Sequence, residues 1–220
     1  MPTVHPQIWV RHAQPEFHVN DWTGGWTDSP LTELGRRQAG LLAERLATEL
    51  QGISWTLYAS DLKRAWQTAE IIAAATGMQP HAAPALREIN NGLAAGKSMD
   101  EARKLALPRS EPWLDWQPYP EAETWRRFHH RVAAFLEEVT PTLDGPVVWV
   151  SHGGTINNAI LWWMELGAEG LNNLYFDCRV ASITVLRVNR WGERTVERQN
   201  DTAHLYAAGL AEPIVLAPRE

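Results

Sequence analysis

Three short apolar runs constrain the fold of this sequence most strongly. Each is nearly continuous in apolar residues, and they are QIWV (7–10), WTLYA (55–59) and VVWV (147–150). Such runs are typical of strands in a parallel sheet whose two faces are both covered by helices. Helix-like segments accompany them at 32–50, 61–77, 120–139 and 155–166. We therefore expect an α/β fold, with helices on both faces of a doubly wound, mostly parallel sheet.

Two later stretches depart from this alternation. The run SITVLRV (182–188) is strand-like. We interpret the overlapping segment 185–199 as a hairpin that turns near 189–192 at one edge of the sheet. The segment from about 90 to 120 contains four prolines and one short helical stretch. We expect it to be a lid-like insertion that arches over the sheet, within a single domain spanning 1–220.

Composition excludes several classes of protein. The 220 residues carry a formal net charge of −6, whereas a nucleic-acid surface needs a basic face. Cys178 is the only cysteine, so neither an intrachain disulfide nor a thiolate metal cluster can form. Apolar stretches are far shorter than the ~20 residues that cross a bilayer, and no signal peptide is evident. We expect a cytoplasmic protein without a membrane or nucleic-acid partner, and make no prediction of its oligomeric state.

Two of the predicted strands lead directly into polar residues. Arg11 and His12 follow the first, and Ser151-His152-Gly153-Gly154 follow the third. In open α/β sheets, ligands bind beyond the carboxyl ends of the strands, and the first N–H groups of the next helix can bind an anion. Either histidine alone would be interpreted as a buried, hydrogen-bonded residue. The repeated arrangement favours a shared site, in which an anion is the missing partner of Arg11.

Two further residues are weaker candidates for this site. Ser60 is expected to cap the next helix, which leaves Arg64 in the first turn, where a cation opposes the helix dipole. Arg64 is either exposed or directed toward an anion, and its position modestly favours the anion. Glu88, in ALREINNG (85–92), is a candidate salt-bridge partner or proton donor. For Glu88 taken alone, the structural role is favoured.

The sequence contains no pattern of metal ligands. His129 and His130 are adjacent on a predicted helix, so their side chains diverge by about 100° and cannot share a metal ion. We expect both at the surface. The histidines away from the strand ends lack ligand spacing, and no HExxH motif is present. We therefore predict neither a metal nor another cofactor.

Five motifs occur in the order found in a known family. They are RHAQ (11–14), GWTDSPLTELGRRQA (25–39), SDLKRAWQTA (60–69), LREINNG (86–92) and VSHGG (150–154). In these motifs the sequence resembles the histidine phosphatase superfamily, also called phosphoglycerate-mutase-like.

The resemblance implies a role for each candidate residue. It implies that His12 is the nucleophile that takes the phosphoryl group and that Glu88 is the proton donor. The implied phosphate-binding groups are Arg11, Arg64, His152 and Gly153. Two arginines supply the positive charge that a phosphate dianion needs, and they should also keep His12 neutral and nucleophilic.

Departures from the family pattern narrow the expected reaction. The family usually has Asn six residues after the nucleophile, where this chain has His18, so Asn20 is our candidate for that role. Asn91 and Met99 stand where cofactor-dependent mutases carry a Tyr and a Lys. We expect a metal-independent phosphomonoesterase that acts on a small phosphorylated metabolite through a phosphohistidine. The alternatives are a cofactor-dependent phosphoglycerate mutase and a non-catalytic phospho-ligand-binding protein on the same fold.

The predicted insertion supplies the residues expected to select the substrate. Trp113, Trp116 and Tyr119 give it a rigid aromatic surface. Glu111 and Asp115 should disfavour a substrate as compact and anionic as phosphoglycerate. The equally weighted alternative is that the tryptophans only pack the insertion onto the domain.

Overall fold

The computed structural model describes residues 5–211 and contains a six-stranded sheet. The strands lie in the order β3-β2-β4-β1-β5-β6. Their bounds are β1 Gln7–Arg11, β2 Thr56–Ala59, β3 Pro80–Ala82, β4 Val147–Ser151, β5 Ile183–Val188 and β6 Arg194–Asp201. The first four strands of this sheet are parallel, while β5 and β6 are antiparallel. The expected mostly parallel sheet, with a hairpin at one edge, is confirmed.

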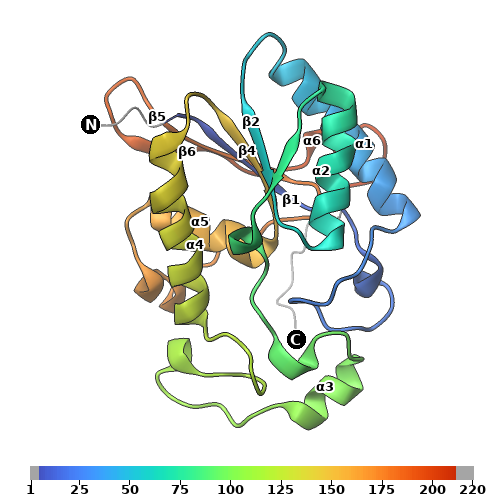
Figure 1. Cartoon of the computed structure of the whole chain (residues 1–220), viewed down its shortest axis with the longest axis vertical. Coiled ribbons are helices and arrows are strands. Elements are labelled where there is room, and N and C mark those ends of the chain that lie inside the picture. The colour runs from blue at the N-terminus through green and yellow to red at the C-terminus, as the bar shows by residue number, and fades with distance from the viewer. Residues whose placement is uncertain (1–4, 212–220) are drawn as a thin grey trace.

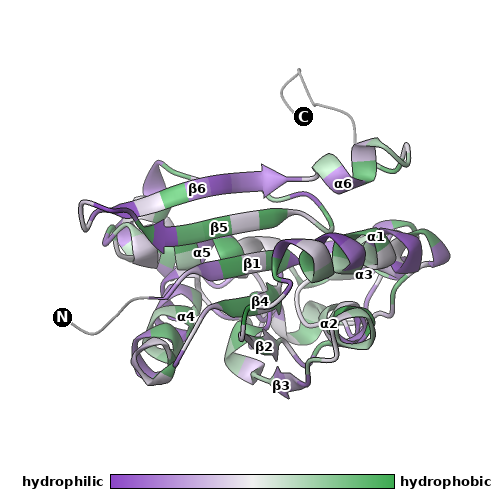
Figure 2. Cartoon of the chain, turned by 90° about the horizontal axis from the view of Figure 1, so that it is seen from above, coloured by the Kyte–Doolittle hydropathy of each residue, from purple (hydrophilic) through white to green (hydrophobic). Residues whose placement is uncertain are grey.

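Helices cover both faces of the sheet (Figures 1 and 2). The helices α1, α2 and α6 pack on one face, and α4 and α5 pack on the other. Their bounds, with that of α3 in the insertion, are α1 Glu33–Glu49, α2 Lys63–Thr76, α3 Met99–Leu105, α4 Trp125–Val139, α5 Gly153–Trp163 and α6 Ala203–Tyr206. Short 3₁₀ helices lie at η1 Glu16–His18, η2 Pro84–Leu86, η3 Gly92–Ala94, η4 Trp113–Asp115, η5 Thr140–Thr142 and η6 Ala168–Asn172.

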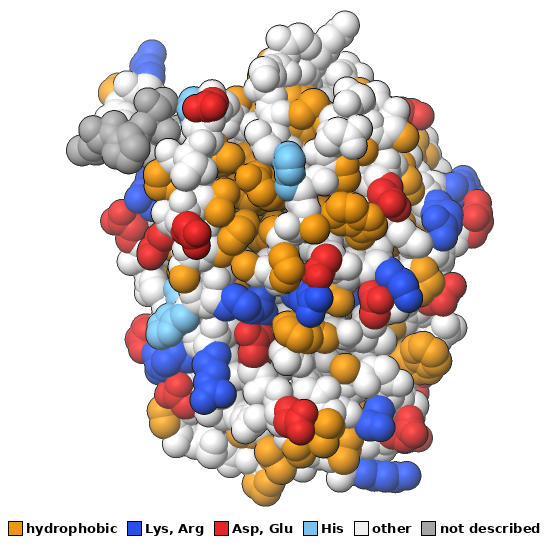
Figure 3. Space-filling model, viewed as in Figure 1, with side chains coloured by type: hydrophobic (Ala, Val, Ile, Leu, Met, Phe, Trp, Pro, Cys, Tyr) orange, Lys and Arg blue, Asp and Glu red, His pale blue; other side chains and the backbone are white. Residues whose placement is uncertain are grey.

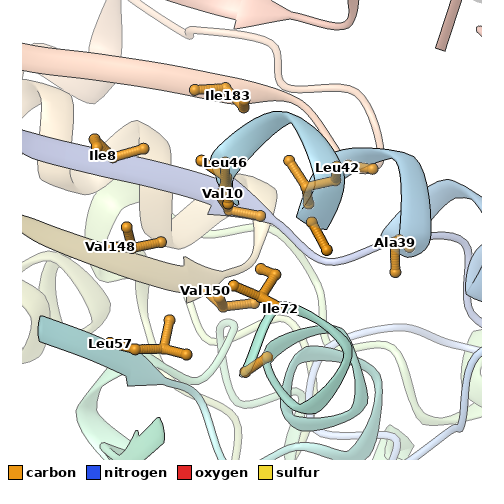
Figure 4. Packing of buried hydrophobic residues seen from close by; sticks show 14 of the residues in the cluster. Ile8, Val10, Ala39, Leu42, Leu46, Leu57, Ile72, Val148, Val150 and Ile183 are labelled. Carbon is orange, nitrogen blue, oxygen red and sulfur yellow. The ribbon is translucent and has the colours of Figure 1, made fainter. Parts of the chain in front are cut away.

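The central strands are apolar throughout because both of their faces are buried. Val10 and Val150 pack with residues of α1 and α2 such as Leu42 and Ile72 (Figure 4). The alternate residues point to the other face, where the stacked rings of Trp9 and Trp149 lie against α4 and α5 with centroids 5.5 Å apart. A continuous apolar run, rather than an alternating one, is the expected pattern for such a strand.

The register of the parallel strands brings the polar strand ends together. Arg11 lies opposite Ser151, and the N–H of His12 donates to the Ser151 carbonyl at 2.9 Å. On the other side of β4, the N–H of Ser60 donates to the Val150 carbonyl at 2.9 Å. The residues that follow β1, β2 and β4 therefore meet at one edge of the sheet, where ligands bind in folds of this class.

The insertion lies beyond these strand ends, with α3 at the bottom of Figure 1. On one side it pairs with the loop after β1 through a bridge between Trp22 and Ser98. On the other side, the indole N–H of Trp113 donates to the side-chain oxygen of Asn172 in η6 at 2.6 Å. The segment is therefore attached at one end to the loop after β1 and at the other to η6.

Some elements differ from the sequence expectations. Helix α4 begins at Trp125 rather than 120, because Glu121 has a φ of +63° and Thr124 caps the helix with its side chain. The edge strand β3 was not predicted, since Pro80–Ala82 has no strand pattern and is defined by its pairing with β2. Helix α5 begins at Gly153, two residues earlier than expected.

The surface seen in Figure 3 has mixed charge. Lys and Arg side chains lie among Asp and Glu side chains over its lower half, and hydrophobic side chains gather above them. Within residues 5–211, none of the helices has the length and apolar character needed to span a membrane.

Candidate active site

His12 lies at the end of β1 and is held as a neutral imidazole. Its Nδ1 is 2.8 Å from the carbonyl oxygen of Ala13, and its Nε2 is 3.2 Å from the Nε of Arg64. The carbonyl only accepts and the guanidinium only donates, so the proton sits on Nδ1 and Nε2 keeps its lone pair. Burial of the ring, with the nearby charge of Arg64, holds the pKa of His12 well below its usual range. Nε2 is therefore available as a nucleophile at neutral pH.

Arg64 is buried beside His12 rather than exposed. It is 1% exposed, and its two terminal nitrogens donate to the carbonyl oxygens of Thr27 and Gly25, each at 2.8 Å. Burial lowers its pKa to about 10, so the group is still protonated at neutral pH. The helix begins one residue before Arg64, with Leu62 at its N-cap, and the expected cap by Ser60 is wrong.

Arg11 is the second cation next to His12. One of its terminal nitrogens donates to the carbonyl of Cys178, and its Nε is buried without a partner. Among the described residues, neither Arg11 nor Arg64 forms a salt bridge with a carboxylate. Arg64 is buried and Arg11 is half-buried. Withdrawing such cations from water without a partner is costly, and the arrangement is suited to an anion.

His152 faces His12 from the end of β4. The centroids of the two rings are 5.1 Å apart. His152 is completely buried at the N-cap of α5, and its Nε2 lies 2.8 Å from the hydroxyl oxygen of Ser60. Its Nδ1 has no hydrogen-bond partner. Burial, followed by the charges of Arg64 and Arg11, holds its pKa well below the usual range, so this imidazole is also neutral.

The two glycines after His152 allow close approach of other groups. The guanidinium of Arg11 lies in van der Waals contact with the position of a Cβ at Gly153, at 3.6 Å. A Cβ at Gly154 would lie only 2.3 Å from Oε1 of Glu88. The second glycine is therefore required by the position of the Glu88 carboxylate.

Glu88 is held at the start of α5 by backbone groups. Its Oε2 accepts from the N–H of Gly154 at 3.0 Å, and its Oε1 accepts from the N–H of Ile89 at 2.9 Å. The carbonyl of Glu88 accepts from the indole of Trp26 at 2.8 Å and from Arg131 at 3.1 Å. Arg131 also donates to the carbonyls of residues 85 and 87, so it fixes this loop to α4.

His18, rather than Asn20, lies beside His12. The rings of His18 and His12 are 6.1 Å apart, and His18 packs edge-on against Phe17 at 4.6 Å. The residue is exposed to solvent on one side, yet desolvation by the surrounding atoms and the charges of Arg11 and Arg64 lower its pKa to about 4. Asn20 is exposed, and its side chain makes no hydrogen bond within the described part of the chain. Its role in phosphate binding stays a prediction.

The aromatic residues of the insertion differ in their surroundings. Trp113 packs on Trp125 of α4, with ring centroids 6.0 Å apart, which favours a packing role for this residue. Trp116 is half-buried, and its indole N–H has no partner among residues 5–211. Tyr119 is also half-buried. Asp115 forms an ion pair with Arg126 at 2.8 Å, so it contributes less negative charge than the sequence suggests.

Three further residues were missed or misplaced by the sequence analysis. Arg131 lies in an ordinary helical pattern that gives no sign of its role. Tyr175, which is largely exposed, belongs to the loop that contacts Arg11. His129 is not at the surface as expected: it is buried, with its Nδ1 3.0 Å from the side-chain oxygen of Asn158. No cluster of potential metal ligands occurs among the described residues.

Comparison with known proteins shows which family the chain is similar to. The family model of the histidine phosphatase superfamily (branch 1) matches residues 8–214. A Hydrogenobacter thermophilus protein with the provisional name phosphoserine phosphatase 2 is 34% identical over 177 residues, covering 76% of this chain and 83% of the relative. A Yersinia pestis protein named "Probable phosphoglycerate mutase GpmB" is 31% identical over 217 residues, covering 92% and 96%.

The fold of this chain is also similar to solved structures of phosphatases. The structure of a mycobacterial glucosyl-3-phosphoglycerate phosphatase is similar, with a TM-score of 0.74 and 25% sequence identity over 90% of this chain and 99% of that protein. Since the family model spans nearly the whole described chain, the protein belongs to the histidine phosphatase superfamily, branch 1.

Proposed function

We propose that this protein is a metal-independent phosphomonoesterase that acts on a small phosphorylated metabolite through a phosphohistidine. The observation that carries the proposal is the neutral His12, with a lone pair on Nε2, beside two arginines that have no carboxylate partner. The broader class, a phosphoric monoester hydrolase, follows from the superfamily and from the phosphatase names of relatives.

In the first step, Nε2 of His12 attacks phosphorus and the bond from phosphorus to the ester oxygen breaks. Glu88, in its protonated form, gives its proton to the leaving oxygen. Arg64 then donates to the phosphoryl oxygens instead of to Nε2, and Arg11 and His152 contribute the donors that are unpartnered in the free protein. Catalysis of this kind depends mainly on positioning and on stabilisation of phosphoryl charge.

In the second step, water attacks the phosphohistidine. The Glu88 carboxylate left by the first step takes a proton from the water, and the bond between phosphorus and Nε2 breaks. Inorganic phosphate leaves, and both His12 and Glu88 return to their starting states. Because the carboxyl group acts first as acid and then as base, a displaced Glu88 should slow both steps.

We place the organic part of the substrate beneath the insertion, against Trp116 and Tyr119. Trp113, which packs on Trp125 and donates to Asn172, holds this segment against α4 and η6. His18 is proposed to replace the asparagine of the family as a neutral group beside the phosphate, since its pKa is lowered to about 4.

The mutase alternative is supported by the 31% identity to the relative named as a phosphoglycerate mutase. The two activities differ in the acceptor of the phosphoryl group, which is water in a phosphatase and a phosphoglycerate in a mutase. Supplying 3-phosphoglycerate and measuring inorganic phosphate against 2-phosphoglycerate separates them.

The proposal is tested by trapping the phosphoenzyme. A screen of phosphorylated metabolites, with a chelator present, should identify a substrate that gives an acid-labile, alkali-stable phosphoenzyme. His12→Ala should abolish both the phosphoenzyme and turnover, while the exposed His130→Ala serves as a matched control. Normal turnover by His12→Ala would refute the proposal, and loss of activity with the chelator would refute metal independence.

A further inference from the structure

Ser60 is buried at the end of β2 and contacts one of the two active-site histidines. Its hydroxyl oxygen lies 2.8 Å from Nε2 of His152, and neither residue is exposed to solvent. The sequence suggested only a helix-capping role for this serine, but the helix is capped at Leu62 instead. The hydrogen of this hydroxyl is therefore available for a contact outside the helix.

The hydrogen bonds around Ser60 determine the direction of this contact. The N–H of Leu62 points at the serine oxygen from 3.4 Å, so the oxygen is already placed to accept from the backbone. The hydroxyl has a single hydrogen, and Nε2 of His152 is its acceptor within residues 5–211. If Nε2 carried the imidazole proton, the buried hydroxyl would be left without an acceptor, which is costly. The serine therefore donates to Nε2.

This direction fixes the tautomer of His152. A neutral imidazole has one N–H and one bare nitrogen, and burial and the nearby arginines keep this ring neutral. Donation by Ser60 to Nε2 leaves the proton on Nδ1, the atom that is buried without a partner. A phosphate oxygen only accepts hydrogen bonds, so Nδ1 must carry the proton if it is to bind one.

We propose that Ser60 is a positioning residue that places the imidazole proton of His152 on Nδ1 and thereby prepares this atom to donate to the phosphoryl group. The inference rests on the proposed phosphatase function for the identity of the ligand, but the tautomer itself is a property of the free protein. It also explains why a hydroxyl group, and not a small apolar side chain, stands at this buried position.

The test combines three variants. Ser60→Ala removes the donor, and Ser60→Thr retains a hydroxyl. Ser182→Ala is the control, because Ser182 is equally buried but its hydroxyl has no partner. The tautomer of His152 is measured in each protein without substrate from the ¹⁵N resonances of its ring, assigned with His152→Gln, and vanadate affinity is measured by calorimetry.

We expect the proton on Nδ1 in the wild type and in both Ser60→Thr and Ser182→Ala. Ser60→Ala should show a large fraction of the Nε2–H tautomer, and its affinity for vanadate should fall about five- to tenfold, the effect of one hydrogen bond. A wild-type ring with its proton on Nε2 would overturn the proposal without any variant. Weaker vanadate binding by Ser60→Ala with an unchanged tautomer would overturn it too, because the effect would then be structural. Failure to find a phosphohistidine would count against the proposed function and leave the tautomer result intact.

Discussion

Replacing Gly154 with alanine should displace the carboxylate of Glu88. The new Cβ would lie 2.3 Å from Oε1 of Glu88 and 3.0 Å from a ring carbon of the buried Phe128. Carbon and oxygen atoms pack at about 3.5 Å, so the carboxylate has to move by roughly 1 Å. The hydrogen bond from the N–H of residue 154 to Oε2, now 3.0 Å long, would be stretched or broken.

The size of the effect follows from two opposing terms. Leaving a buried polar group without its hydrogen-bond partner costs about 1–3 kcal/mol, while alanine in a helix is up to ~1 kcal/mol better than glycine. We expect the free energy of unfolding to fall by about 1–2 kcal/mol. General acid–base catalysis contributes about 10²–10⁴-fold, so kcat for an alkyl phosphate should fall by about that factor while phosphate affinity, which depends on Arg11 and Arg64, changes little.

Gly40→Ala provides the matched control. Gly40 is also a helical glycine, in α1, but a Cβ there would meet no atom within 4 Å. This variant should be slightly more stable than the wild type and fully active. Both variants are compared by urea unfolding and by kcat on an alkyl and an aryl phosphate. The aryl ester should be less affected by Gly154→Ala, because its leaving group needs less protonation. Wild-type kcat of Gly154→Ala on the alkyl ester would refute the assignment of Glu88 as proton donor.

Three further outcomes are expected. Arg64→Ala should lower the free energy of unfolding, measured in urea, by about 2–3 kcal/mol, because two carbonyls lose their donor. It should also weaken vanadate binding at least tenfold in calorimetry. The helix dipole alone predicts unchanged stability, and that result would contradict the role of these two hydrogen bonds. His12 and His152 stay neutral in the folded protein, so below pH 6.5 the unfolded chain binds more protons than the folded one. The free energy of unfolding should therefore fall as the pH falls, by up to about 1.4 kcal/mol per pH unit for each histidine. A urea midpoint that stays constant from pH 6.5 to 5 would contradict this expectation. Trp113→Ala should make the insertion more susceptible to proteolysis. Trp116→Ala should instead change the ranking of substrates in a metabolite screen while small aryl phosphates are still hydrolysed. An unchanged ranking would remove Trp116 from the proposed pocket.

The sheet and the positions of the two histidines could be predicted because both depend on local pattern. A parallel strand buried on both faces has to be apolar along its length, as QIWV and VVWV are. Once two such strands are adjacent, the residues that follow them meet at one edge. The pairing of Arg11 with Ser151 in the register of β1 and β4 follows from this rule.

Contacts made over long sequence separations could not be predicted in the same way. Strand β3 exists because it pairs with β2, and its three residues have no strand pattern. The burial of His129 depends on Asn158, which lies on the neighbouring helix. Ser60 has the composition of a helix cap, and only the fold shows that His152 is its partner. In each case the sequence gives the residue type, while the partner is supplied by packing.

The placement of acidic residues argues most directly for an anionic ligand. The chain has an excess of six acidic side chains, and half-buried arginines such as Arg45 and Arg126 each pair with two carboxylates. Among the described residues Arg64 is the only buried Arg or Lys, yet it has no carboxylate within salt-bridge distance. Glu88 is close enough to act on its charge, but both Glu88 oxygens accept from backbone N–H groups instead. A fold selected for stability alone would have paired Arg64 with that carboxylate, and a buried guanidinium left without a carboxylate is suited to an anionic ligand.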